Sequence, residues 1–521
     1  MKKYYSELAI SLDLTFINLS RKFRCFFFVF AFYFVYSVML KRSVGLLVEQ
    51  KPATSSALAK QIWKASVRSV RIESVWLDFG KQVQAQSPFL TPRDVATIIH
   101  SFARIKWKDE KLLTFLTPSI LKHIDTFSVR EIVHILSAFR KLEYARLDCI
   151  DLLMNQLVLK YSDWNGVDVA LIANAAGWFQ IFDQNLVWKR VFKYTMKNSR
   201  ELSPLGISLI IGAMAKLDLR NEHVLSRLAR QLVSGHTQGI FKQESFAVLV
   251  HGFYKLDWTR DFRLNTFFED QLIGLLSMEE SFFDQQSLCM ILHAMVGYRL
   301  LGEPNWSDLQ LEIIRKGFTE GLEKFSKLST DQYRRMDEVC LICSRNKSLP
   351  PVVQRFRKEI LRKQELASIK QRGHKLPRWE YEVYRILKDK MEVPVMKKNR
   401  NGRTDIHIKP NLKIGLNKEV CVLCLGPFQY YTDSTKRTSA SRLNRALINT
   451  DLVIEIPFFI WNELKTDQDK IMYLYSQGRR VLSSATTRED TTVNDITDNE
   501  EYVMEQNVPR PDFDEEIEKI L

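Results

Sequence analysis

Two Cys-x-x-Cys pairs have the spacing that could hold a metal ion. They are Cys340 with Cys343 and Cys421 with Cys424, and two such pairs can supply the four thiolates of a structural zinc site. Zinc-binding pairs lie in tight turns, however, whereas these pairs stand in apolar runs, Val-Cys-Leu-Ile-Cys and Val-Cys-Val-Leu-Cys. The second run reads as a β-strand, in which residues three apart point to opposite faces. We therefore expect no metal and no other cofactor.

A column of polar side chains is the second candidate for chemistry. One position of a recurring pattern holds His100, Ser137, Asn174, Gly212, His251 and His293, and the position four residues later holds Arg104, Lys141, Trp178, Lys216, Lys255 and Gly297. One polar or basic group per repeat, in register, is how helical-repeat proteins contact a single strand of RNA. RNA-binding residues are therefore predicted at His100, Arg104, Lys141, Asn174, Trp178, Lys216, His251, Lys255 and His293. The alternative is the solvated face of any helical array, where a lysine before a turn also suits a helix C-terminus.

The elements that would position this column are six copies of one fourteen-residue pattern. The copies are Asp94–Trp107, Glu131–Tyr144, Asp168–Ile181, Gly206–Leu219, Ser245–Trp258 and Ser287–Leu300. Positions two, five, six, nine and twelve are apolar, which is helical periodicity with one buried face. The eighth position is always small: Ser101, Ala138, Ala175, Ala213, Gly252 and Ala294. Second amphipathic stretches follow, as at Leu147–Tyr161, so the sequence predicts helix pairs stacked as an α-solenoid.

Length and charge agree with an array followed by further domains. The 521 residues are 45% hydrophobic and carry a formal net charge of +15, and they exceed one ordinary core. Residues 484–521 contain 12 acids and three bases, a net charge of −9, so the remaining 483 residues carry +24. A body that basic favours a polyanionic partner, although import into an organelle could also explain it. The acidic tail is predicted to be disordered, and seven sparse cysteines argue against a secreted disulfide scaffold.

The N-terminal region carries two competing targeting signals. Cys25–Leu40 is an uncharged 16-residue run, slightly short for a membrane span of about 20 residues. Met39–Arg71 has seven basic residues, one acid and several Ser and Thr residues, which is typical of a mitochondrial presequence. We predict a presequence that begins near Met39, with residues 1–38 an over-extended start, and a location in the mitochondrial matrix. Membrane contact is expected only if residues 25–40 are a genuine anchor.

From Trp379 the periodicity changes from helical to mixed. The predicted elements are a helix at 379–391, strands at Arg403–Ile408 and Glu419–Leu425, a helix at Ser439–Asn449, a strand at Leu452–Ile456 and a helix from Phe459 to Leu464 that resumes near Lys470. This order predicts an α/β domain with a mixed sheet.

This C-terminal part resembles the RAP domain, an RNA-binding domain abundant in apicomplexans. The matching features are a helix bearing Glu382, the strand Thr404-Asp405-Ile406, a strand ending in Gly426-Pro427 before aromatic residues, a Thr-Lys-Arg stretch, a basic helix, and Val453–Phe458 with Trp461 and Leu464. RAP proteins, among them organellar RNA-binding proteins, typically place this domain after degenerate helical repeats. The resemblance implies selective binding of organellar transcripts or rRNA, with a basic groove at Lys397, Lys398, Arg400, Arg403, Lys436, Arg437, Arg442 and Arg445.

The RAP fold in turn resembles the PD-(D/E)xK nucleases, which raises the question of catalysis. Such nucleases need two acids for Mg²⁺ and a lysine that positions the attacking water. Asp405 could supply the first acid, but Leu423 and Leu425 stand at the positions of the second acid and the lysine. We therefore expect no catalytic residue and no RNA endonuclease activity. The roles left for Glu382, Asp405, Gly426, Pro427 and Trp461 are to support the fold or to orient RNA.

The sequence thus predicts a mainly α protein, with an α-solenoid of about six two-helix repeats followed by a small α/β domain of restriction-endonuclease-like fold. The predicted boundaries are 1–75 for the targeting segment, 76–350 for the solenoid, 351–377 for a basic helix and linker, 378–483 for the RAP domain and 484–521 for the acidic tail. The predicted function is non-enzymatic mitochondrial RNA binding in RNA stability, processing, translation or ribosome assembly. Its expected partners are single-stranded or ribosomal RNA and RNA-processing or ribosomal proteins. The alternative is a permanent structural component of the mitochondrial ribosome.

Overall fold

The computed structural model describes most of the chain between residues 54 and 488. The described ranges are 54–182, 186–234, 241–277, 283–301, 303, 306–321, 329–344, 353–358, 378–400, 403–410, 418–432, 436–448 and 452–488. The apolar run at 25–40, the presequence start at Met39, most of the basic linker and the acidic tail from residue 489 lie outside these ranges. Among the described helices, none combines the length and the apolar character that a membrane crossing requires.

The chain forms two compact units, and each is described by itself. The first unit holds Met1–Leu366 together with Tyr430–Leu443, and the second holds Ala367–Gln429 together with Asn444–Leu521. The sequence placed Tyr430–Leu443 inside the C-terminal domain. The structure differs, because this segment packs with the helices of the first unit.

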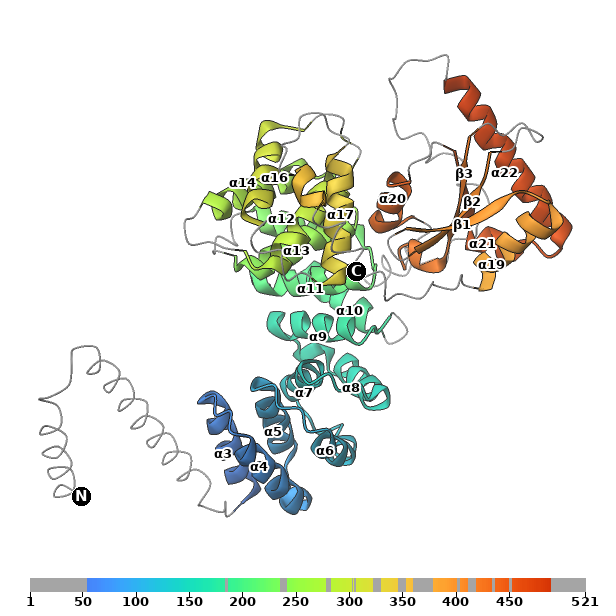
Figure 1. Ribbon diagram of the computed structural model, residues 1–521. Helices are drawn as coiled ribbons and strands as arrows, with labels where there is room; N and C mark the ends of the chain where they lie inside the picture. Colours follow the sequence, from blue (N-terminus) through green and yellow to red (C-terminus); the bar gives the residue numbers. More distant parts are fainter. Residues whose placement is uncertain are drawn as a thin grey trace, which may run out of the picture. The chain divides into compact units, whose positions relative to one another are not determined.

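All six predicted repeats of the first unit are helix pairs (Figure 1). Their first helices are α5 (Pro92–Arg104), α7 (Val129–Lys141), α9 (Gly166–Trp178), α11 (Pro204–Lys216), α13 (Gln243–Lys255) and α15 (Gln285–Leu292), the last continued by the π-helical η5 (His293–Arg299). Their second helices are α6 (Glu110–Lys122), α8 (Leu147–Leu159), α10 (Val187–Asn198), α12 (Glu222–Val233), α14 (Phe262–Ser277) and α16 (Asp308–Gly321). Successive first helices pack on one another, which confirms the predicted helical array.

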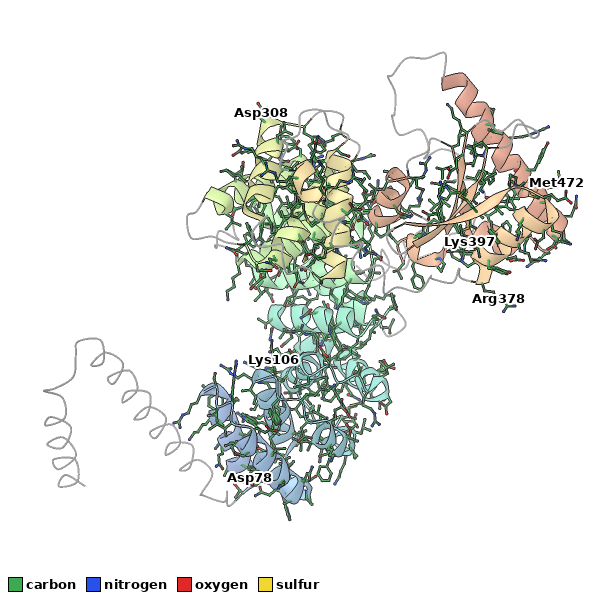
Figure 2. All side chains as sticks on the ribbon, viewed as in Figure 1. Asp78, Lys106, Asp308, Arg378, Lys397 and Met472 are labelled. Carbon is green, nitrogen blue, oxygen red and sulfur yellow. The ribbon has the colours of Figure 1, made fainter. Side chains whose placement is uncertain are left out.

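Local signals explain where each first helix begins and ends. The first position of the pattern is acidic in copies one to three because Asp94, Glu131 and Asp168 close capping boxes with the residue three before them, which satisfies backbone N–H groups of the first turn. After the twelfth position the chain passes through a left-handed residue with φ between 51° and 62°: Lys106 (labelled in Figure 2), Glu143, Gln180, Asp218 or Asp257. The repeat in the sequence therefore reflects turn geometry as well as core packing.

The small residue at the eighth position lies where successive first helices approach closely. All six residues at this position are buried. Ala213 of α11 packs against Gly177 of α9, where an added Cβ would lie 2.7 Å from the Cβ of Ala213. Gly252 of α13 faces Ile211 of α11 in the same way. Larger side chains would force these helices apart, which explains why the eighth position is small at Ala213 and Gly252.

The array extends beyond the six copies at both ends. Helix α3 (Ser55–Val67) begins after the capping residue Thr54 and is followed by the left-handed residue Ser69. Thr54 and Ser69 lie 37 positions before Thr91 and Lys106, the residues that play the same parts around α5. The apolar face of α3 is buried, and α3 packs on α5 and on α4 (Glu73–Gln86). The sequence had placed these residues in the targeting segment 1–75. At the other end, α17 (Thr330–Cys343) packs on η5.

The second unit is built on a four-stranded sheet. Its strands are β1 (Val395–Arg400), β2 (Arg403–Ile408), β3 (Val420–Leu425) and β4 (Val453–Pro457), in that order, with β1, β2 and β3 antiparallel and β4 parallel to β3. Its helices are α19 (Arg378–Arg385, continued by the π-helical Ile386–Lys390), the end of α20 (Ser439–Ala446), α21 (Phe458–Glu463) and α22 (Asp467–Arg488). The mixed sheet and flanking helices confirm the predicted fold class, but β1 was not predicted.

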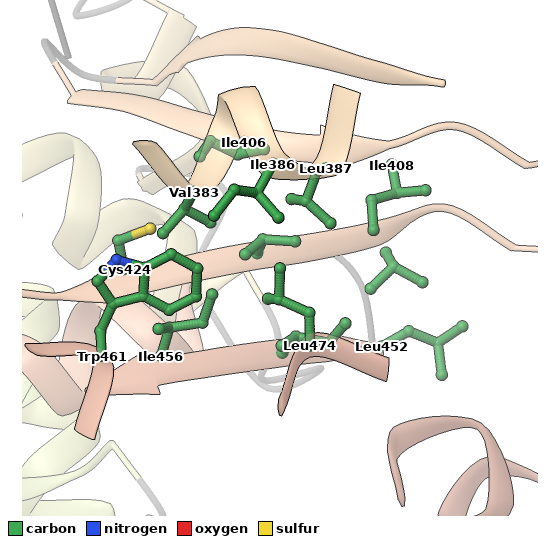
Figure 3. Packing of buried hydrophobic residues seen from close by; sticks show 13 residues of the cluster. Val383, Ile386, Leu387, Ile406, Ile408, Cys424, Leu452, Ile456, Trp461 and Leu474 are labelled. Atoms are coloured by element: carbon green, nitrogen blue, oxygen red, sulfur yellow. The ribbon is translucent and has the colours of Figure 1, made fainter. Parts of the chain in front are cut away.

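One face of this sheet forms the core of the second unit (Figure 3). Helices α19, α21 and α22 supply Val383, Trp461 and Leu474, which pack on alternate residues of the strands. The strand residues in this core include Ile406, Ile408, Val422, Cys424, Ile454 and Ile456. The remaining strand positions, such as Asp405 and Leu423, therefore point to the other face, because strand side chains alternate.

Candidate nucleic-acid interface

The predicted column is accessible in copies one to five and buried in copy six. Arg104, Lys141 and Lys216 are exposed, and His100, Asn174, Trp178, His251 and Lys255 are partly exposed. In copy six, Gly297 is buried and the His293 side chain is only 5% exposed. The column is thus a continuous surface feature of the first five copies only.

The centre of the column combines one aromatic ring with four cations. Trp178 lies near the end of α9 with its ring partly exposed, and the ring packs edge-on against Phe179 with centroids 4.8 Å apart. Copies one and two supply Arg104 and Lys141, and copy four supplies Lys216. Arg140 adds a further cation from the tenth position of copy two. We call Arg104, Arg140, Lys141, Trp178 and Lys216 the basic face.

Two residues of this surface were missed by the sequence prediction. Arg140 occupies the tenth position, where the neighbouring copies have Ala103 and Gly177. A charge at a position that is small in both neighbouring copies was the available signal. Trp63 of α3 occupies the seventh position by the register that relates Thr54 to Thr91, and its side chain is 47% exposed. The column therefore begins one helix pair earlier than predicted.

The cations of the basic face act on one another rather than on carboxylates. Burial lowers the pKa of Arg140, and burial together with the charges of Arg140 and Arg104 lowers the pKa of Lys141. Burial and the charge of Arg140 also lower the pKa of Lys216, two copies away. The ion pairs between described residues include none of these four cations. Clustered cations of this kind favour a bound polyanion, because phosphate relieves their mutual repulsion.

Histidines extend the surface in uncharged form. The rings of His100 and His134 stack with centroids 4.8 Å apart. Burial, with the neighbouring positive charges, lowers the pKa of His100 to about 4 and also lowers that of His134. Both imidazoles are therefore neutral near pH 7 and can offer hydrogen bonds and a flat face, but no charge.

In copies five and six, the same positions make contacts within the array. Lys255 pairs with Asp218 at 2.9 Å and donates a hydrogen bond to the Ala215 carbonyl. His293 contacts a carboxylate oxygen of Glu338 on α17 through its Nε2, at 3.0 Å. These contacts explain why the predicted column does not continue as an open surface through copy six.

The predicted groove residues of β1 and β2 have mixed surroundings. The Lys397 ammonium (Figure 2) lies over the rings of Tyr384 and Tyr381, 4.3 and 5.2 Å from their centroids. Lys398 pairs with Glu419, which also contacts His407 at 2.5 Å. Arg400 and Arg403 face each other across the β1–β2 turn, and their side chains lie outside the described part of the structure.

The other four predicted groove cations have partners from their own unit. Lys436 and Arg442 both pair with Asp257 of the array, Lys436 at 2.8 Å. Arg437 donates hydrogen bonds to the hydroxyl and the carbonyl of Ser441. Arg445 pairs with Glu455 of β4 at 3.3 Å. Each of these four cations is therefore engaged by a partner within its own unit.

The residues tied to the nuclease question lie on the sheet and its first helix. Asp405 is the cross-strand neighbour of Lys398 on β1. On its other side, Ile406 pairs with Val422 of β3, so the next residue pair in this antiparallel register is Asp405 and Leu423. Glu455 lies on the far side of Leu423, so a leucine separates the two acids.

Glu382 of α19 belongs to the packing of the second unit. It accepts hydrogen bonds from Trp461 Nε1 at 3.1 Å and from Lys470 Nζ at 2.8 Å. Gly426 follows β3 beside the Trp379 ring, and Pro427 begins a short 3₁₀ turn. These contacts place Glu382, Trp461, Gly426 and Pro427 in structural surroundings.

The Cys-x-x-Cys pairs are buried. Burial raises the pKa of Cys340, Cys343 and Cys424, which keeps their thiols protonated. Within the described ranges, no group of three or more His, Cys, Asp or Glu residues has an arrangement suited to a metal ion.

Comparisons with known proteins match two parts of the chain. Residues 77–193, from α4 into α10, match a family described as RNA-editing substrate-binding complex 6 protein. Residues 422–477, from β3 into α22, match the RAP domain. No curated protein matches the chain. The strand ending in Gly426-Pro427, the helix α20 and the strand β4 with Trp461 all lie inside the second match, so the chain is a RAP-domain protein whose RAP domain follows a helical array.

Proposed function

We propose that this protein binds single-stranded RNA through the basic face and acts in mitochondrial RNA processing. The observation that carries the proposal is the partly exposed ring of Trp178 among four cations that have no carboxylate partner in the described structure. A single strand offers unpaired bases that stack on aromatic rings and phosphates that pair with cations. A double helix keeps its bases stacked on one another and would leave Trp178 without a partner.

The comparisons support RNA as the ligand. The match to the RNA-editing substrate-binding complex family covers Arg104, Arg140, Lys141 and Trp178. The RAP domain adds a second RNA-related module to the same chain. Import into the mitochondrial matrix is proposed from the presequence-like composition that begins at Met39.

We propose further that the RAP domain has no nuclease activity. A metal-dependent nuclease needs two adjacent carboxylates on one ion. Asp405 has Leu423 as its neighbour on β3, and Leu425 follows two residues later. Glu455, the next acid on this face, is paired with Arg445. RNA would accordingly be held rather than cleaved.

The test compares the basic face with matched residues on the second helices. In the Trp178→Ala variant, RNA affinity should fall by about 1–3 kcal/mol, the usual contribution of one stacked base. In the Arg140→Ala, Lys216→Ala double variant, the slope of log affinity against log salt should fall by about 0.7 per lost phosphate contact. The controls are Phe115→Ala and Lys111→Ala on the exposed side of α6.

The measurement is fluorescence anisotropy of labelled single-stranded RNA at several salt concentrations. The control variants should bind like the unaltered protein, because neither control residue lies in the column. The proposal is wrong if the basic-face variants keep both the affinity and the salt slope of the unaltered protein.

A further inference from the structure

A segment that belongs to the RAP domain by sequence caps two helices of the array. Thr432 donates hydrogen bonds from its backbone N to the Asp218 carbonyl at 3.0 Å and from its hydroxyl to the Leu217 carbonyl at 2.7 Å. Tyr431 Oη donates to the Lys255 carbonyl at 2.7 Å. We call Tyr430–Leu443 the capping segment, because carbonyls at a helix C-terminus lack partners within the helix and this segment supplies them at α11 and α13.

The capping segment is also internally ordered around Tyr431. This side chain is 2% exposed, and its hydroxyl lies 3.2 Å from the Ser439 hydroxyl. Ser439 in turn donates to the Tyr254 carbonyl at 3.1 Å, and the Arg220 guanidinium lies over the Tyr431 ring, 5.9 Å from its centroid. The segment thus meets the ends of α11 and α13 through several buried side chains.

Asp257 is the charged centre of this contact. It occupies the left-handed turn after α13, and its side chain is 8% exposed. Lys436 and Arg442 of the capping segment both pair with it. Burial alone would raise the pKa of Asp257, but the two cations outweigh burial and hold the pKa below its ordinary value. The carboxylate is therefore ionised and neutralised by the capping segment near pH 7.

The register of the repeats explains why copy five needs cations from outside the array. In copy four, Asp218 occupies the thirteenth position and pairs with Lys255 at the eleventh position of the next copy. By the same register, Asp257 would pair with the eleventh position of copy six, which is Gly297. Gly297 has no side chain, and a Cβ placed there would lie 3.3 Å from Leu443 Cδ2. The capping segment occupies this space and brings the missing charge.

We propose that Asp257 and the C-terminal ends of α11 and α13 form a docking surface for the chain's own residues 430–443. Lys436 and Arg442 replace the lysine that copy six lacks, and their role is to attach this part of the RAP domain to the array. They do not serve as phosphate contacts. RNA therefore binds without opening the capping segment, and the array requires this segment for the stability of its later copies.

A charge exchange in the full-length protein tests this role. Asp257→Arg alone, and Lys436→Asp with Arg442→Asp, should each lower the melting temperature, because each places like charges together around the buried position 257. The triple variant that combines all three changes should recover most of the loss. Arg385→Asp, which removes an exposed pair with Asp467, is the control and should change the melting temperature little.

Two further measurements keep the test decisive if a reversed variant fails to fold. In the milder Lys436→Ala, Arg442→Ala variant, amide hydrogen exchange should rise at the ends of α11 and α13 and stay unchanged in α5 and α7. The salt slope for single-stranded RNA should remain that of the unaltered protein. The proposal is overturned if the triple variant recovers nothing. It is also overturned by a second outcome in the alanine variant. In this outcome the slope of log affinity against log salt falls by about 1.4, the value for two phosphate contacts, while amide hydrogen exchange at the ends of α11 and α13 is no faster.

Discussion

Gly177 offers a sharp test of how the helix pairs are packed. It lies in α9 at the tenth position of copy three, where a Cβ would meet the Cβ of Ala213 at 2.7 Å and its Cα at 2.8 Å. Two effects oppose each other when Gly177 is replaced by alanine. Helix propensity favours alanine by about 1 kcal/mol, whereas overpacking of a tight contact costs about 1–3 kcal/mol.

The nature of the neighbouring atoms decides between the two effects. The added methyl would meet backbone and Cβ atoms of α11, which cannot move without shifting the whole helix, rather than the end of a flexible side chain. We therefore expect Gly177→Ala to lower the free energy of unfolding by up to about 2 kcal/mol, the overpacking cost less the propensity gain. Gly274 is the matched control, because it lies on the exposed side of α14, where an added Cβ would have no atom within 4 Å.

The assay is urea denaturation of both variants, followed by circular dichroism. Gly274→Ala should raise the denaturation midpoint, since only the propensity gain of about 1 kcal/mol remains. Gly177→Ala should lower the midpoint with an unchanged slope, which reports stability rather than a change in exposed surface. A Gly177→Ala protein stabilised as much as the Gly274→Ala protein would refute the packing argument, because no overpacking cost would then oppose the propensity gain.

Two further predictions concern titratable groups. Burial lowers the pKa of His251 and, against the opposing effect of Glu338, that of His293. The unfolded chain therefore binds protons first, and the melting temperature should fall as the pH drops below about 6.5, the ordinary pKa of histidine. His251→Phe should weaken this dependence and the exposed His223→Phe should not. Glu382→Ala should lower the free energy of unfolding by about 1–3 kcal/mol in urea denaturation, because it leaves the buried Trp461 N–H and the Lys470 ammonium without their acceptor. The control Glu463→Ala, at an exposed residue of α21, should change it little.

The helical array could be predicted because several local constraints repeat together. A capping acid, an apolar face and a small eighth residue recur in one order, as at Asp94, Ile98 and Ser101. Each constraint depends on contacts within one copy or with the next copy. It therefore recurs in the sequence at the spacing of the repeats. In the RAP domain, β3 and β4 could be predicted because their largely apolar runs are buried in the sheet.

Other features could not be predicted because their partners lie far away in the sequence or their residues are polar. Strand β1 reads Val-Met-Lys-Lys-Asn-Arg, and such charged sequences are common on sheet edges. Helix α3 shares its capping residue and its left-handed turn with the later copies, but Gln61 and Arg68 stand at the fifth and twelfth positions, which are apolar in those copies. The capping segment contacts the array across more than 170 residues of sequence, a separation at which no local pattern operates.

Equivalent positions of the repeat thus serve different purposes according to what covers them. At the eleventh position, Lys141 and Lys216 face other cations, Lys255 faces Asp218, and Gly297 makes room for Leu443. The sequence alone predicts one role for the whole column, because the pattern is the same.

The residue at the thirteenth position of the preceding copy decides whether the cation at the eleventh position is paired within the array. It is acidic at Asp218 and Asp257, and each of these carboxylates is paired with cations of the first unit. It is basic or neutral at Lys106 and Gln180, which precede Lys141 and Lys216, and the ion pairs between described residues include neither of these lysines. Glu143 is also acidic, but the next eleventh position is Trp178, which offers no charge to pair with. Asp218 therefore engages the following lysine, Lys255, within the array, and where this acid is absent we expect the lysine to contact a ligand.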